Sequence, residues 1–387
     1  MPPDSWTPGR ADDVDLADTV AEIIVGGPGE TSTCNALRAK LLGDSESARN
    51  TWEQLGKLGY LSITLPERYG GSGAGLRDAL PLVEQVGRSL FPAPVMETVV
   101  VCGPILARYG SAGLCAEWLP SLGAGDRVVI PVAFAPGSDL SIDSLVIGEQ
   151  AGEAGAPVLV GSCEFVPFGA MADALLVLAR QLDSDRVALV LVRTDDPAVS
   201  VEPVNAFDPT TDAARVTLNG VASYDVLASG RGGDLVDELV TQLWLGLGML
   251  SVGAAQRVVA MARDHAVTRQ QFGVPIGAFQ AIKHQIVDMH LSAEALVSLV
   301  YYGARELDVN GPQARSAVWA ARERARTDLV AMAEANVQIH GAMGFTEEMD
   351  CHLFVKRAWT WSSAWASGRA VRLGRGRAVS PLSAAKN

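Results

Sequence analysis

The feature that most constrains the fold is the length of the helical patterns in the last part of the 387-residue chain. From about Gly233 onward, apolar residues recur at three- and four-residue spacing in runs longer than a typical globular helix. Three such runs follow one another, over 234–269, 279–308 and 316–341. Long amphipathic helices in succession predict an antiparallel helical bundle.

The rest of the chain contains two regions of different texture. Residues from Val14 to about Asp126 have a mostly helical pattern, whereas those from about Arg127 to Ser229 form short β-branched runs separated by turn residues. No helical segments separate these runs, which argues against a Rossmann sheet and favours an antiparallel barrel or sandwich. We therefore predict an α+β multidomain protein: an N-terminal helical domain (1–126), a middle β domain (127–231) and a C-terminal four-helix bundle (232–387).

The composition argues against several classes of function. A formal net charge of −13 gives no electrostatic support for nucleic-acid binding. The five cysteines are scattered and include no C-x-x-C pair, so they indicate neither a disulfide framework nor a metal site and suit a reducing cytoplasm. The N-terminus does not read as a secretory signal. The uncharged stretch 239–256 contains polar residues and glycines, which favours a core helix over a membrane span.

One glycine-rich segment, YGGSGAG at 69–75, has the composition of a phosphate-binding loop. No strand pattern precedes it, and no Lys-Ser or Lys-Thr pair follows it, as a phosphate loop requires. We interpret this segment as a turn between helices.

The segment RQQFGVPIGAFQ, residues 269–280, separates two of the long helical runs. Its arginine offers bidentate hydrogen bonds to a pyrophosphate, and Gly273 and Pro275 predict a turn. It resembles the R-x-x-F-G-x-x-I-x-x-F-Q hallmark of the acyl-CoA dehydrogenases. The resemblance implies that Arg269, Phe272 and Gln280 contact the FAD of a neighbouring subunit, in a homodimer or homotetramer. The alternative interpretation is an interhelical turn with a surface arginine.

A second segment, QIHGAMGFT at 338–346, is similar to the family's Q-x-x-G-G-x-G motif, with Ala342 in place of the middle glycine. Glycines allow backbone amides to approach a dinucleotide closely. The resemblance implies a set of residues that line the cofactor: Gln338, His340, Gly341 and Gly344. The alternative interpretation is an ordinary helix stop.

Weaker similarity extends into the middle region. Residues 132–139, VAFAPGSD, resemble a shortened form of the family's T-E-P-x-x-G-S-D segment, and Phe165-Val166-Pro167 replaces its later W-I-T/S segment. By this resemblance Phe134, Ser138 and Val166 are further candidates for contact with the flavin.

The catalytic glutamate of the family has no counterpart at its usual place. Counting from Gly344 along the family's spacing reaches Trp365 instead. Some members carry the base on the helix before the R-x-x-F-G turn, but Leu243 to Val252 is uncharged here, and Asp237 and Glu238 lie about a helical turn or more too early. We keep these two acids as weak candidates. Trp359, Trp361 and Trp365 are candidates for the acyl pocket, with core or interface packing as the alternative.

The resemblance implies a cytoplasmic flavoenzyme of lipid or polyketide metabolism that dehydrogenates a short acyl or enoyl thioester, carried by CoA or a carrier protein. The new double bond forms at the family's usual position or at the γ,δ position. The electron acceptor is an electron-transfer flavoprotein or a similar protein. The alternative is a non-catalytic subunit that shares FAD in a heteromeric acyl-CoA dehydrogenase. A flavin oxidase of another class has no residue in its favour.

Overall fold

The computed structural model describes residues 11–25, 35–41, 43–44, 46–134, 142–152, 156–181, 184 and 186–364. They pack into two compact units, each formed from several parts of the chain. Unit 1 takes residues up to Gln54, Gly75–Pro92 and Leu247–Ser362, and unit 2 takes Leu55–Ala74, Ala93–Gly246 and the residues from Ser363. These units cut across the three sequence regions, so the predicted domain boundaries remain a prediction.

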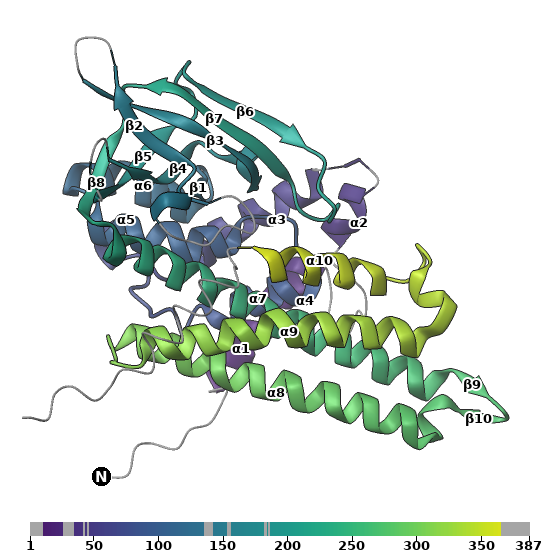
Figure 1. Cartoon of the computed structure of the whole chain (residues 1–387). Coiled ribbons are helices and arrows are strands. Elements are labelled where there is room, and N and C mark those ends of the chain that lie inside the picture. The colour runs from purple at the N-terminus through teal and green to yellow at the C-terminus, as the bar shows by residue number, and fades with distance from the viewer. Residues whose placement is uncertain are drawn as a thin grey trace, which may run out of the picture. The chain divides into compact units, whose positions relative to one another are not determined.

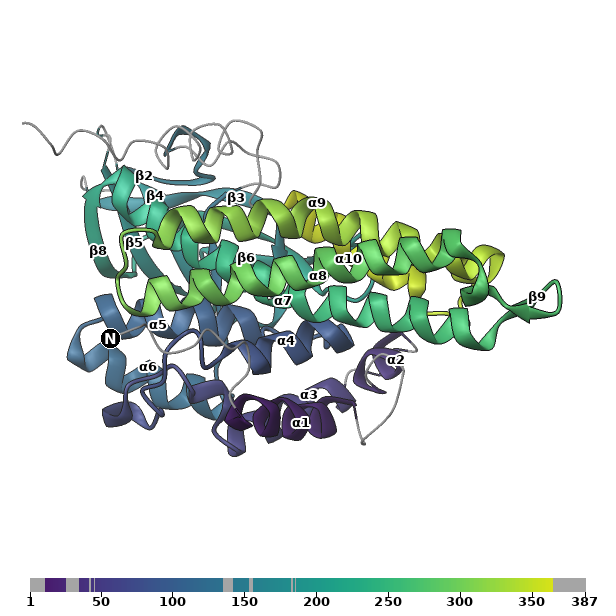
Figure 2. The same cartoon turned by 90° about the horizontal axis from the view of Figure 1, so that it is seen from below.

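Unit 1 consists of helices and one short hairpin. Its elements are α1 (Ala11–Val25), α2 (Asn35–Leu41), most of α3 (Glu46–Lys57), α4 (Leu80–Ser89), the second part of α7 (Gly232–Thr268), β9 (Gln270–Gln271), β10 (Val274–Pro275), η7 (Ile276–Ala278), α8 (Gln280–Asp308), α9 (Ala314–His340), η8 (Gly341–Phe345) and nearly all of α10 (Cys351–Ser363). Figure 2 shows α8 and α9 side by side, next to the second part of α7. The buried residues of α8 include, at three- and four-residue spacing, Met289, Ala293, Leu296, Val300 and Ala304. The predicted C-terminal bundle of long helices is confirmed.

Helices α4 and α7 cross at two glycines within unit 1. A Cβ atom on Gly87 would lie 1.9 Å from the carbonyl oxygen of Leu250, and one on Gly253 would lie 1.8 Å from that of Glu84. Backbone approaches this close leave no room for a side chain, so glycine is required at both positions.

The glycine-rich segment is a turn, as the sequence predicts. It follows η2 (Glu67–Tyr69) and leads to α4. Just beyond it, the amides of Leu76 and Arg77 donate to the two carboxylate oxygens of Asp308, at 2.7 and 3.0 Å. A Cβ on Gly75 would lie 2.5 Å from the same carboxylate. The backbone amides that follow this turn therefore bind the carboxylate of Asp308, at the end of α8.

Unit 2 combines helices with a sheet. Its helical elements are η1 (Tyr60–Ser62), η2, the π-helix η3 (Glu97–Cys102), α5 (Gly103–Tyr109), α6 (Ala112–Ala124), the first part of α7, and the short helices η4 (Ile142–Ser144) and η6 (Gly169–Met171). The side chain of Ser111 caps α6 by accepting from the amide of Leu114 at 3.2 Å, and Gly125 ends the same helix in the left-handed conformation.

The sheet of unit 2 has eight strands (Figure 1). They are β1 (Val129–Val132), β2 (Ile147–Ala151), β3 (Pro157–Pro167), β4 (Ala174–Arg180), β5 (Arg186–Arg193), β6 (Val199–Val204), β7 (Ala213–Val221) and β8 (Asp225–Arg231). Their order is β6-β7-β3-β2-β4-β5-β8, and β1 pairs with β4. Strands β4 and β5 are buried on both faces, which explains their unbroken apolar sequences.

The predicted α+β fold class is confirmed, but the expectation of a wholly antiparallel sheet is wrong. Strands β1 and β2 both run parallel to β4. The chain reverses once before and once after β3, so β4 returns alongside β2 in the same direction. The sequence patterns did not predict strands β2 and β6. Strand β2 is largely polar, and the edge strand β6 contains Glu202 and Pro203.

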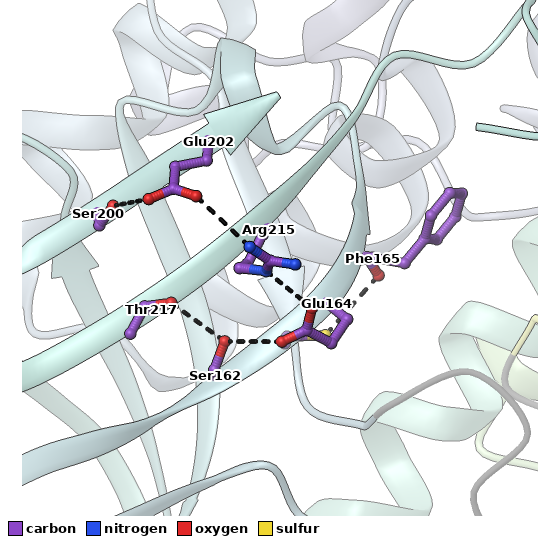
Figure 3. A network of polar contacts seen from close by, with 8 residues as sticks. Ser162, Glu164, Phe165, Ser200, Glu202, Arg215 and Thr217 are labelled. Carbon is purple, nitrogen blue, oxygen red and sulfur yellow. Dashed lines mark hydrogen bonds and ion pairs between the residues drawn. The ribbon is translucent and has the colours of Figure 1, made fainter. Parts of the chain in front are cut away.

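Polar side chains from three neighbouring strands form a network on one face of the sheet (Figure 3). The guanidinium of Arg215 on β7 bonds to Glu164 on β3 at 2.7 Å and pairs with Glu202 on β6 at 3.5 Å. The hydroxyls of Ser162 and Thr217 share a hydrogen bond of 3.0 Å. The charged side chains of this network are exposed. Strand β7 alternates them with residues such as Val216, which are buried in the core.

Helix α7 is long and apolar enough, by length and composition alone, to cross a membrane. In this structure 83% of its most apolar window is buried inside the protein. That burial agrees with the core helix expected from the sequence.

Candidate cofactor and active site

The ends of α7 and α9, next to the two family-like segments, meet at one end of the unit 1 bundle. The imidazole rings of His265, in the last turn of α7, and His340, at the end of α9, stack with their centroids 4.1 Å apart. Arg269 follows His265 by four residues, and Gln338 precedes His340 by two. We call this region the cofactor end and define it as Arg269, Phe272, Gln280, Gln338 and Gly341.

The turn at the cofactor end is a tight hairpin, labelled at β9 and β10 in Figure 1 and at β9 in Figure 2. Gln270 pairs with Pro275 and Gln271 with Val274. Phe272 and Gly273 both have positive φ angles, 54° and 80°, as a two-residue hairpin turn requires. Phe272 is 92% exposed, and its ring packs edge-on to Phe279 with centroids 6.1 Å apart. An exposed aromatic pair on a rigid turn is typical of a surface that another molecule covers.

The polar side chains of the cofactor end project into solvent. Arg269, Gln280 and Gln338 are all exposed, and the guanidinium of Arg269 bonds to nothing in the described part of the chain. Gly341 has a φ of 64°, and open space surrounds the position of its absent Cβ. A free guanidinium, two amide side chains and an uncovered glycine backbone form a donor set that suits a pyrophosphate.

Two of the predicted cofactor residues lie inside the protein. His340 is buried, and its Nδ1 lies 2.8 Å from the carbonyl oxygen of Asn336. A Cβ on Gly344 would lie 2.9 Å from the carbonyl oxygen of Val337, so this glycine allows the turn to pack on α9. Both residues therefore support the backbone that presents Gln338 and Gly341.

Burial sets the electrostatics of the stacked imidazoles. It lowers the pKa of His340, and the hydrogen bond to Asn336 opposes that shift. It also lowers the pKa of His265, and the nearby His340 and Arg269 lower it further. Both rings are therefore neutral at neutral pH, and the positive charge at this end belongs to Arg269.

The candidates in the middle region lie within unit 2. The side chains of Phe134 and Val166 are buried, and Val166 pairs with Ala214 in the sheet. Phe134 forms an isolated bridge with Leu145. Neither side chain is exposed to solvent in this structure. Ser138 lies outside the described residues.

Of the two weak candidates for the base, Glu238 is held by other side chains. Its carboxylate forms an ion pair with Arg108 at 3.0 Å and accepts a hydrogen bond from the hydroxyl of Tyr109. Burial, together with this carboxylate, raises the pKa of Tyr109 to about 12. These contacts join α5 to α7. Asp237 is half-buried on the same turn of α7.

Comparison with known proteins covers both helical regions. A model of the acyl-CoA dehydrogenase N-terminal domain matches residues 34–126, and one of the C-terminal domain matches residues 230–366. Together these matches span more than half of the chain. The chain belongs to the acyl-CoA dehydrogenase family. It is thus an oxidoreductase of the class that acts on CH–CH donors, as the sequence predicts.

Individual relatives agree with this assignment. The chain is 28% identical over 347 residues to the acyl-CoA dehydrogenase FadE27 of Mycobacterium tuberculosis, covering 86% of this chain and 89% of the relative. It is 26% identical to a chain of the ChsE4–ChsE5 complex from Mycobacterium tuberculosis, with a TM-score of 0.83 over 97% of this chain and 100% of the other. Butyryl-CoA dehydrogenase from Megasphaera elsdenii shares the fold, with a TM-score of 0.82, 19% identity and coverage of 97% and 99%.

FAD is the cofactor of this acyl-CoA dehydrogenase, as predicted. The residues present fit it, because the guanidinium of Arg269 is unpaired among the described residues and the backbone at Gly341 is uncovered. A dinucleotide needs both a cationic partner and close backbone approach.

The tryptophans of the expected acyl site have different surroundings. Trp361 is buried, with the guanidinium of Arg357 over its ring at 5.1 Å. Its carbonyl oxygen accepts from Arg322 at 2.8 Å. Trp359 is 51% exposed, and Trp365 lies outside the described residues.

Arg322 holds the C-terminal end of α10. It donates to the carbonyl oxygens of Trp361 and Ser362, at 2.8 and 3.2 Å, and burial lowers its pKa to about 10. A cation at this end also complements the helix dipole. Arg322 thus fixes the last turn of α10.

The sequence reading missed a buried polar group in unit 2. Among the described residues, only two carboxyl side chains are buried, those of Glu97 and Asp208. Glu97 begins the π-helix η3, an element often found at functional sites. The only signal in the sequence is one acid within the apolar run 95–102, which a helical reading passes over.

Proposed function

We propose that this chain dehydrogenates a short acyl or enoyl thioester, carried by CoA or a carrier protein, with an electron-transfer flavoprotein or similar acceptor. One observation carries the proposal: the guanidinium of Arg269, which has no partner among the described residues, lies at the same end of unit 1 as Gln338 and the open backbone of Gly341. The family assignment supplies the reaction class. The location that follows for such an enzyme is the cytoplasm.

In this proposal the cofactor end binds the FAD of a neighbouring subunit. Arg269 and Gln338 bind the pyrophosphate, Gln280 adds a hydrogen bond, and Phe272 contacts an aromatic face. The same end exposes several large apolar side chains: Phe272 (92%), Phe345 (78%), Met343 (45%), Phe279 (39%) and Val274 (39%). Apolar groups gathered in this way support a covering second copy, in a homodimer or homotetramer.

FAD, when bound, accepts the hydride that leaves the β-carbon of the thioester. The protein must then supply a base for the α-proton and hydrogen-bond donors for the thioester oxygen. The region 239–256 of α7 contains no acid, and Glu238 is paired with Arg108. Trp359, Trp361 and Trp365 would shorten the acyl site. This combination supports a short substrate and a shifted bond position, such as γ,δ.

A second candidate is a subunit of a heteromeric acyl-CoA dehydrogenase that holds FAD while its partner supplies the base. Its support is the 26% identity to a chain of the ChsE4–ChsE5 complex, together with the uncharged stretch 239–256. In this reading the chain alone acts on no thioester.

The test is to purify the chain alone, record its absorbance spectrum, measure its mass in solution, and titrate it anaerobically with acetyl-, butyryl-, crotonyl- and hexanoyl-CoA. We expect a yellow dimer or tetramer whose flavin is bleached by one of these thioesters. A yellow protein that no thioester bleaches would favour the subunit reading. A colourless monomer that takes up no added FAD would contradict both readings.

A further inference from the structure

We propose that the stacked imidazoles of His265 and His340 are positioning residues for FAD, because they hold together the two chain segments that bind it. The inference rests on the proposed role of the cofactor end. His265 lies in the last turn of α7, and His340 is the last residue of α9. The histidine stack, as we call this pair, therefore joins the ends of the two helices from which the FAD-binding segments emerge.

The two rings of the histidine stack pack face to face. Their centroids lie 4.1 Å apart, and their planes are inclined by 23°. Aromatic pairs usually have their centroids about 4.5 to 7 Å apart, so this contact is a close one. The imidazole of His265 makes no hydrogen bond to any described residue. The ring of His340 is therefore the group that holds the ring of His265 in place.

His340 is itself held by its own helix and by η8. Its Nδ1 lies 2.8 Å from the carbonyl oxygen of Asn336, and because a carbonyl oxygen only accepts, Nδ1 donates this hydrogen bond. A Cβ atom on Gly344 would lie 3.2 Å from the Cβ of His340, so η8 folds back closely onto this residue. His340 is only 6% exposed. It is thus a fixed point of α9, directly before Gly341.

The chain that follows His265 is constrained in a similar way. The amide of Arg269 donates to the carbonyl oxygen of His265 at 2.8 Å, and the carbonyl oxygen of Arg269 accepts from the amide of Ile276 at 2.8 Å. A Cβ on Gly277 would lie 2.9 Å from the carbonyl oxygen of Ala266, so the segment after the hairpin packs on the last turn of α7. The backbone of Arg269 is therefore tied to that of His265.

The histidine stack links the two binding segments through short connections. Arg269 lies four residues after His265, and Gln338 lies two residues before His340. A pyrophosphate that both side chains bind requires a fixed separation between their backbones. A segment that is already ordered loses less conformational entropy when its ligand binds. Removal of the stack should therefore weaken FAD binding, although it changes no group that is assigned to contact FAD.

The first test is the FAD affinity of the full chain, measured by titrating FAD-free protein with FAD. We expect His265→Ala to bind FAD roughly 10-fold more weakly than the wild type, because the two segments are then no longer held together. His265→Phe keeps a ring in the stack and should bind FAD as the wild type does. Equal affinities of the Ala and Phe variants would overturn the proposal, since the ring would then have no role.

The matched control is His290→Ala, which removes an exposed histidine of α8. It should bind FAD as tightly as the wild type. A loss as large as that of His265→Ala would overturn the proposal, because the effect would not be specific to the stack.

A second test asks whether His265 acts through Arg269. His265→Ala should weaken FAD binding less in an Arg269→Ala protein than in the wild type, since the group that it positions is already gone. An equal loss in both proteins would mean that His265 does not position Arg269 and would overturn the proposal.

A third test needs no FAD. Hydrogen–deuterium exchange of the FAD-free protein, followed by mass spectrometry, should be faster in His265→Ala in the peptides that contain the amides of Arg269 and Gly341. His265→Phe should match the wild type. His265→Leu, which has an apolar side chain without a ring, takes the place of His265→Ala if that variant does not fold. Unchanged exchange, or faster exchange throughout unit 1, would overturn the proposal, because the stack would then have no local role.

The outcomes also distinguish this proposal from the proposed dehydrogenation. If a thioester bleaches the wild-type flavin but His265→Ala binds FAD as tightly, only the role of the histidine stack fails. If His265→Ala loses affinity for FAD but no thioester bleaches the wild type, the dehydrogenation fails and the positioning role stands. If the wild type takes up no FAD, the role of the cofactor end fails and the positioning role fails with it.

Discussion

The cofactor end and a second region carry their polar groups in opposite surroundings. We call the second region the η3–α7 contact, formed by Met96, Glu97, Thr98, Gln242 and Gly246. At the cofactor end, Arg269 and Gln338 are exposed beside an aromatic ring that is 92% exposed. At the η3–α7 contact, Glu97 is only 5% exposed and Thr98 is completely buried. The first region is an exposed surface with a large apolar group on it, whereas the second contains polar groups that the core has removed from water.

Because of this difference, substitutions in the two regions should affect different properties of the protein. A substitution of an exposed group at the cofactor end should change ligand affinity and leave folding intact. A substitution at the η3–α7 contact should act on packing, on chemistry or on both, because its atoms already touch one another. The following predictions test that distinction, from the largest expected effect to the smallest.

Arg269→Ala should weaken FAD binding by about 3 kcal/mol, or roughly 100-fold, because it removes the charged partner of the pyrophosphate. The urea midpoint of the FAD-free protein should not change, since this guanidinium bonds to no described residue. Titration of the FAD-free protein with FAD measures the affinity. The control is Arg263→Ala, which removes an exposed arginine in the last part of α7 that pairs with Asp264 at 2.8 Å. Equal affinities of the two variants would contradict the assignment of Arg269.

Gly246→Ala should lower the free energy of unfolding by about 2 kcal/mol, because its Cβ would lie 2.5 Å from Met96 and the contact is already filled. Urea denaturation measures the change. Gly113→Ala in α6 is the control, since no atom lies within 4 Å of its Cβ position, and alanine favours the helix there. A Gly246→Ala protein as stable as the control would show that η3 and α7 are not packed as described.

The stacked pair His265 and His340 should make stability depend on pH. Burial lowers the pKa of both rings in the folded protein, so the unfolded chain binds more protons as the pH falls. Their contribution is present above the unfolded pKa of about 6.5 and is lost as the pH falls through the folded values. The slope is at most about 1.4 kcal/mol per pH unit for each ring, and lower for the partly exposed His265.

Urea denaturation of the FAD-free protein between pH 8 and pH 5 measures this dependence. His265→Phe keeps an aromatic ring in the stack and should flatten the curve. An unchanged slope would mean that the pair does not titrate with folding.

Arg215→Ala should leave the urea midpoint unchanged within error, although it removes the centre of the network in Figure 3. Exposed ion pairs add little to stability, because water solvates both charges equally well in the unfolded chain. High salt should shift the urea midpoint of the wild type and that of Arg215→Ala by the same amount. A clear loss of stability would show that this face of the sheet is covered in the assembled protein.

Parts of the site were predictable because they are local in sequence. The turn at 269–280 has its glycine at a positive φ angle, and its arginine lies directly after a helix end, so a short motif records the geometry. The same is true of Gln338 and Gly341 at the end of α9. The role of His340 was harder to predict, because a histidine beside a glycine gives no sign of whether its ring faces a ligand or another ring.

The sequence by itself determined the helical, β and helical order of the chain, the long C-terminal helices and the turn at 269–280. Each of these depends on periodicity or on neighbouring residues. Only the tertiary structure decided that Glu238 pairs with Arg108, that Trp361 packs beneath Arg357 and that Met96 meets Gly246. Met96 and Gly246 are 150 positions apart in the sequence. Burial and partner choice depend on such distant contacts, which no local pattern of residues encodes.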